Sequence, residues 1–126
     1  MIIIDTDVLI EILDKKSEKG DEALKRIIQS GEDITTTAIN LHEILYGLQK
    51  YAKPIKEILL LPVLNYTKKD SILSSKIELE AESKGMPIRR TDAMIAAITI
   101  NNGATLYTFD SKHFSPLKSL SLKLFP

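Results

Sequence analysis

Short apolar runs alternate along the chain with longer segments whose apolar residues recur every three or four positions. Short apolar runs are typical of buried strands. Segments with the longer period are typical of helices that cover a sheet. The predicted strands are 2–4, 34–36, 62–64, 105–108 and 120–124. The predicted helices are 6–14, 21–30, 38–50, 54–61, 68–84 and 91–102, with a polar loop at 15–20. This alternation predicts an α/β fold in three layers, α/β/α, around a mostly parallel sheet of four to five strands.

The predicted elements end at residues that start or stop helices. Thr37 is a good N-cap for the helix 38–50, and Gly31 closes the helix 21–30. The helix 91–102 is apolar on all sides, which indicates that it is buried. No repeat, low-complexity tract or linker interrupts the pattern, so residues 1–126 are expected to form a single domain.

Four acidic residues stand where these elements would meet at one edge of the sheet. Asp5 follows the first strand and Asp110 the strand 105–108, and parallel sheets bind ligands at the carboxyl ends of their strands. Asp92 opens the buried helix, and Glu43 lies within the helix 38–50. Carboxylates brought together repel one another unless a cation lies between them, and a hard divalent cation is the usual candidate.

Each acid also has an ordinary structural interpretation. Asp5 is a possible helix N-cap, Asp92 a compensator of a helix dipole, and Asp110 a turn residue. Glu43 lies nearly opposite the main apolar stripe of its helix, as a solvated acid would. Asp7, in the first turn after Asp5, is ambiguous between these roles. Beside Glu43 runs a second apolar strip, Ile39, Tyr46 and Gly47, for which a subunit contact is one possible burial place.

Composition narrows the chemistry. Cysteine is absent and there are two histidines, so a metal would be held mainly by oxygen, which favours Mg²⁺ or Mn²⁺ over zinc. The 17 basic and 17 acidic residues cancel, so nucleic-acid binding would need a local basic patch. Candidates are Arg89 and Arg90 before Asp92, Lys112 and His113 after Asp110, and Lys15, Lys16 and Lys19 after the first helix. A solvated rim is the alternative, and for the lysines it is the favoured one. No signal peptide or membrane span is visible, so a cytoplasmic protein is expected.

Four segments combine these acids with their neighbours, in order along nearly the whole chain. They are 3–10 with Asp5, 37–47 with Glu43, 87–97 with Asp92, and 108–114 with Asp110. Together they resemble the motifs of PIN-domain ribonucleases, specifically the VapC-type toxins of toxin–antitoxin pairs. Asp7 departs from the pattern, since Asn or Ser is commoner there, and some members carry Asn in place of Asp110.

The resemblance implies an endoribonuclease that depends on Mg²⁺ or Mn²⁺, ions that activate water and stabilise the leaving group in phosphodiester hydrolysis. It implies Asp5, Asp92 and Asp110 as metal ligands, with Glu43 binding directly or through water. One-metal and two-metal versions both remain open. The resemblance further implies an RNA substrate, a homodimer, and a cognate antitoxin whose tail blocks the acidic cleft.

Three other classes of function are considered. Asp5-Thr6-Asp7 after a strand is typical of haloacid dehalogenase phosphatases, but the Gly-Asp acid pair expected near the fourth strand is missing. A signalling receiver needs an acceptor aspartate after the third strand, where Asn65 stands instead. A binding module that keeps only the fold would lose nothing on Asp5→Asn or Asp92→Asn, whereas an enzyme would lose its metal-dependent cleavage.

Overall fold

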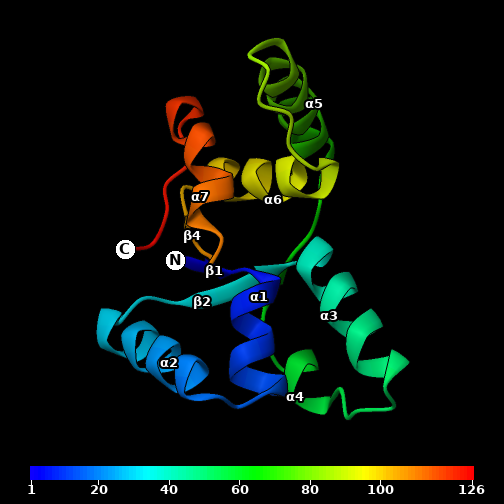
Figure 1. Cartoon of the computed structure of the whole chain (residues 1–126), viewed down its shortest axis with the longest axis vertical. Helices are drawn as coiled ribbons and strands as arrows, with labels where there is room; N and C mark the ends of the chain where they lie inside the picture. The colour runs from blue at the N-terminus through cyan, green and yellow to red at the C-terminus, as the bar shows by residue number, and fades with distance from the viewer.

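A four-stranded parallel sheet forms the centre of the protein, and the computed structural model describes all of residues 1–126 (Figure 1). The strand order is β3-β2-β1-β4. The strands are β1 (Ile2–Ile4), β2 (Ile34–Thr37), β3 (Val63–Leu64) and β4 (Thr105–Tyr107). Ile3 on the central strand β1 is paired with Thr35 of β2 and Leu106 of β4. All four carboxyl ends therefore point to the same edge of the sheet.

Helices cover both faces of this sheet. The helical elements are α1 (Thr6–Leu9), η1 (Ile10–Asp14), α2 (Glu18–Ser30), α3 (Ala38–Lys50), α4 (Lys56–Leu59), α5 (Lys68–Ser83), α6 (Arg90–Asn101), α7 (Ser111–Phe114) and η2 (Ser115–Leu120). Of these, η1 is a π-helix and η2 a 3₁₀-helix. In Figure 1 the helices α1 to α4 lie on one side of the strands, and α5 to α7 on the other. None combines the length and apolar character that crossing a membrane requires.

Alternation along β1 divides the core in two. Ile3 packs with the buried residues of α5, α6 and α7, whereas Ile2 and Ile4 pack with those of α1 to α4. Helix α6 is buried over most of its length, from Ala93 to Thr99, as its apolar pattern predicted. The three-layer α/β/α prediction is thereby confirmed.

The prediction of a fifth strand at 120–124 is wrong. Residues Ser115–Leu120 form η2 instead, and Ser121 then takes a left-handed backbone conformation with φ 79°. Beyond this turn only a single parallel bridge joins Leu124 to Leu106, so no strand develops. The short helix α7 was not predicted.

The predicted loop 15–20 is also partly wrong, because α2 begins at Glu18. The side chain of Ser17 caps it by accepting a hydrogen bond from the backbone of Gly20. Gly20 lies so near η1 that a Cβ there would stand 2.1 Å from the carbonyl oxygen of Glu11. The predicted helix 6–14 exists, but its second half widens into η1.

Candidate active site

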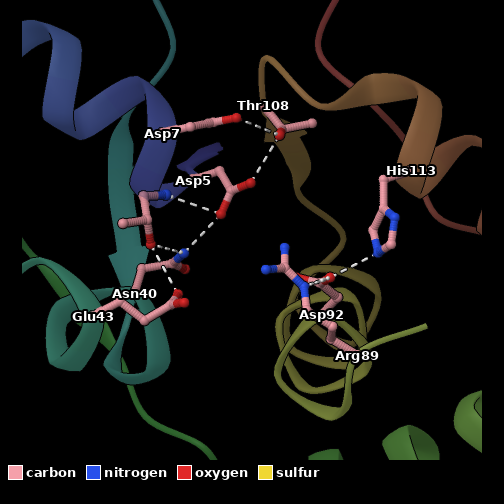
Figure 2. Close-up of polar contacts among 9 residues, drawn as sticks. Asp5, Asp7, Asn40, Glu43, Arg89, Asp92, Thr108 and His113 are labelled. Atoms are coloured by element: carbon pink, nitrogen blue, oxygen red, sulfur yellow. Dashed lines mark hydrogen bonds and ion pairs between the residues drawn. The ribbon is translucent and has the colours of Figure 1, made fainter.

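A cavity of about 200 Å³ opens at the carboxyl ends of β1 and β4, beside the starts of α3 and α6. Its polar lining consists of Thr6, Arg89 and five acids, which are Asp5, Asp7, Glu43, Asp92 and Asp110. We call this space the acid cavity. Figure 2 shows Asp5, Asp7 and Glu43 on one side of it, facing Arg89, Asp92 and His113 on the other.

Asp5 is held in place by hydrogen bonds from three directions. Its Oδ1 accepts from the backbone N–H of Thr6 and from Asn40 Nδ2, both at 2.9 Å. Its Oδ2 accepts from Thr108 Oγ1 at 2.8 Å. Asp5 is thus the N-cap of α1 and also the junction of β1, α3 and β4. Rotation of this carboxylate would break its contacts with Thr6, Asn40 and Thr108.

Burial raises the pKa of Asp5 to about 6, helped by the neighbouring charge of Asp7 and opposed by the hydrogen bonds from Thr108 and Thr6. Burial also raises the pKa of Asp7, against the hydrogen bond that the Phe109 N–H donates to its Oδ2 at 3.1 Å. The other oxygen of Asp7, Oδ1, is buried without any partner. Both carboxylates therefore lie where a positive charge would stabilise their ionised forms.

Glu43 lines the cavity from an exposed position on α3. Its exposure was predicted, because it lies nearly opposite the apolar stripe of that helix. Its Oε1 accepts a hydrogen bond from Thr6 Oγ1 at 2.9 Å, and that hydroxyl accepts one from Asn40 Nδ2 at 2.9 Å. The fully buried Asn40 thus links Asp5 to Glu43 through the hydroxyl of Thr6.

Asp92 stands across the cavity, buried in the first turn of α6. Its Oδ2 accepts a hydrogen bond from Arg89 Nε at 3.0 Å and lies 2.9 Å from His113 Nε2 (Figure 2). The Asp92 carboxylate raises the pKa of the Arg89 guanidinium. Asp110 is exposed at the start of α7, and its backbone N–H donates to Thr108 Oγ1 at 3.0 Å.

The donor set suits a hard divalent cation, because it offers carboxylate oxygens only. The unpartnered Asp7 oxygen and the raised pKa values of Asp5 and Asp7 point the same way. However, no three acidic or histidine side chains lie close enough to share one ion, and Arg89 and His113 both contact Asp92. The residues fit the ion chemically, and binding would require Asp92 to exchange these partners for it.

The predicted site residues differ in where they lie. Asp5, Glu43, Asp92, Asp110 and Arg89 line the acid cavity. Lys112 lines a neighbouring hollow that also contains Asp110. Arg90 is turned toward α5, where it makes two hydrogen bonds with the carboxylate of Glu78 at 3.1 and 3.2 Å.

Three further residues organise the site without having been singled out for these roles. Asn40 joins Asp5 to Glu43, Thr108 joins Asp5 to Asp7, and His113 contacts Asp92. One signal for Asn40 was available, since it stands three positions after the N-cap Thr37 in a helix with a strong apolar stripe. Nothing local to the sequence distinguishes Thr108 or His113 in the same way.

This fold and this acidic edge define a known class of protein. The family model of the PIN domain matches residues 2–118, and the chain belongs to the PIN-domain family. Within it the chain resembles VapC proteins. Ribonuclease VapC1 of Methanocaldococcus jannaschii is 32% identical, over 98% of this chain and 86% of the relative. Ribonuclease VapC2 of Rickettsia felis is 26% identical, over 96% of this chain and 95% of the relative.

Solved structures show the same fold. VapBC2 from Rickettsia felis, bound to a DNA fragment from its promoter, superimposes with a TM-score of 0.82 at 26% identity, covering 99% of this chain and 98% of that one. DNA-bound VapBC from Salmonella typhimurium gives a TM-score of 0.81 at 23% identity, covering 98% and 96%. The architecture is therefore that of the matched chains in these VapBC complexes.

Proposed function

We propose that the protein is an endoribonuclease dependent on Mg²⁺ or Mn²⁺ and the toxin of a toxin–antitoxin pair. The observation that carries this proposal is the acid cavity, in which five carboxylates from four separate segments of the chain line one small space. The relatives named ribonucleases support RNA as the substrate. PIN-family membership does not favour the phosphatase or receiver alternatives.

In this proposal Asp5, Asp92 and Asp110 hold the ion, with Glu43 binding it directly or through water. The chemistry that a bound Mg²⁺ supplies is activation of water and neutralisation of charge on the phosphoryl and leaving oxygens. Asn40 and Thr108 orient Asp5 through their hydrogen bonds. Arg89, once released from Asp92, is positioned to bind a phosphate oxygen of the RNA at the mouth of the cavity.

The proposal includes partners. The VapBC complexes among the similar structures support a cognate antitoxin as a partner. In this proposal the antitoxin covers the acid cavity, and the protein is cytoplasmic. A homodimer is also proposed. Of the apolar strip considered for it, Tyr46 is 64% exposed on α3, whereas Ile39 packs partly buried against the core.

Cleavage of total cellular RNA in Mg²⁺, with sequencing of the new ends, tests the proposed activity. We expect Asp5→Asn and Asp92→Asn each to reduce cleavage by about a hundredfold or more, because charge stabilisation at the phosphate is lost. Chelation of divalent ions should abolish cleavage by the wild-type protein. Asp21→Asn, an exposed acid on α2, is the matched control and should cleave normally.

Circular dichroism should show that all variants are folded. Metal-independent cleavage, or full activity of Asp5→Asn, would refute the proposal. Folded wild-type protein that cleaves no RNA but still binds partners would favour the binding-module alternative.

A further inference from the structure

Three hollows adjoin one another across the carboxyl edge of the sheet, and Asp110 lines all of them. The acid cavity is the smallest. On one side of it lies a hollow of about 400 Å³ that shares Asp7, Ile10 and Asp110 with it and adds Glu11, Lys15, Lys19 and Phe109. We call this the Lys19–Phe109 hollow. On the other side lies a hollow of about 330 Å³ with Lys112 and His113.

Each flanking hollow carries a lysine that forms no ion pair. Lys15 lies 3.9 Å from Glu11, but neither Lys19 nor Lys112 has an acidic partner within ion-pair distance. A phosphate beside Lys19 or Lys112 would meet a positive charge, whereas Asp110 lines both hollows and Asp7 and Glu11 line that of Lys19. This distribution suits a polyanionic strand that crosses the acid cavity and continues on both sides.

The Lys19–Phe109 hollow also has an aromatic wall. Phe109 is half-buried, and its ring packs edge-on against Tyr107 with centroids 5.9 Å apart. The ammonium of Lys19 lies 4.1 Å from the Phe109 centroid, over one face of the ring. The Phe109 backbone N–H donates to Asp7 Oδ2, which connects this residue to the wall of the acid cavity.

We propose that the Lys19–Phe109 hollow is a nucleotide subsite, in which Phe109 stacks an unpaired base and Lys19 binds the adjoining phosphate. The inference rests on the proposed function and extends it to the form of RNA that is bound. Aromatic stacking requires a base with a free face, which a single strand offers and a duplex does not. A volume of about 400 Å³ lies within the range of small-ligand sites.

Binding of fluorescently labelled single-stranded RNA, followed by anisotropy in Mg²⁺, tests the subsite without turnover. The measurement uses the full chain carrying Asp5→Asn, so that RNA remains intact. We expect Phe109→Leu, which keeps the apolar packing, to weaken binding about fivefold or more. Lys19→Ala should weaken binding. It should also reduce the slope of log affinity against log salt concentration by about 0.7 in magnitude, the contribution of one phosphate contact on a single strand.

Lys25→Ala is the matched control, because Lys25 is exposed on the same helix but lines none of the three hollows. It should leave both affinity and salt dependence unchanged. Duplex RNA of the same sequence should bind more weakly than the single strand and should not respond to Phe109→Leu. Melting temperatures check that each variant is folded.

Equal loss on Lys19→Ala and Lys25→Ala, or unchanged binding by a folded Phe109→Leu, would overturn the subsite. Tighter binding of duplex RNA would overturn it as well. Failure of the proposed function is separable from these outcomes, since it appears as absence of metal-dependent cleavage by the otherwise wild-type chain.

Discussion

Arg89 places a positive charge at the acid cavity, on the buried carboxylate of Asp92. Its side chain is 70% exposed, yet its Nε reaches the buried carboxylate of Asp92. A guanidinium in this position supplies the positive charge that a cation would otherwise supply. The pair lies one helical turn apart on α6 and its N-cap, so Arg89 can leave Asp92 by side-chain rotation alone.

Replacing Arg89 with Met should therefore strengthen binding of a divalent ion to the isolated protein. The substitution removes a competitor for the Asp92 carboxylate and makes the cavity more negative. We expect about three- to tenfold tighter binding of Mn²⁺, as suits a partly exposed ion pair, measured by calorimetry.

Arg90→Met is the control, since Arg90 pairs with Glu78 outside the cavity, and it should leave the affinity for Mn²⁺ unchanged. Unaltered or weaker binding by Arg89→Met would show that Arg89 does not compete with the ion.

Among the elements, the junction of α1, η1 and α2 shows what local pattern does and does not predict. The strand β1, the N-cap at Asp5 and the amphipathic face of α2 follow from residues close in sequence. The widening into η1 does not, because it accompanies the close approach of α2. There Gly20 lies directly against the Glu11 carbonyl, so this glycine is needed for close packing and not for a loop.

Gly20→Ala should consequently destabilise the fold. A Cβ 2.1 Å from the Glu11 carbonyl oxygen would force α2 away from η1, at a cost of about 1–3 kcal/mol in the free energy of unfolding. Urea denaturation measures this change. Glu22→Ala, at an exposed position of the same helix, should stay within about 0.5 kcal/mol of wild type. A Gly20→Ala protein as stable as wild type would contradict the packing argument.

For the whole molecule, the acid cavity is a source of instability. Asp5 has a folded-state pKa of about 6 and a reference value of 3.8, so between these pH values the folded state binds more protons than the unfolded state. The free energy of unfolding should therefore fall as pH rises from about 4 to about 6, and this loss is complete above the folded pKa. Burial of the ionised Asp5 carboxylate in the acid cavity thus lowers the free energy of unfolding at neutral pH.

Asp5→Asn should remove that loss. Above pH 7 and without divalent ions the variant should be more stable than wild type by up to about 3 kcal/mol, and the advantage should disappear below pH 4. Denaturation across this pH range measures the difference, and saturating Mg²⁺ should narrow it by stabilising the wild type. Equal stability of the two proteins at pH 7 would contradict the raised pKa of Asp5.

Local pattern was enough to predict most of the fold, because strands, helix caps and buried helices depend on residues within a few positions of one another. It also indicated which acids would follow strands, and hence the edge at which they would meet. The prediction of a fifth strand was wrong because the chain turns at Ser121, and the apolar run 120–124 does not reveal this turn.

The contacts that organise the site needed the folded chain. Asn40 bonds to Asp5 across 35 positions and Thr108 across 103, so no sequence window contains both partners. The engagement of Asp92 by His113, and the Lys19 ammonium over Phe109, likewise arise only when separate elements pack. Chain pattern determines which groups arrive at an edge, whereas packing determines which atoms touch there, because contact distances depend on every element between them.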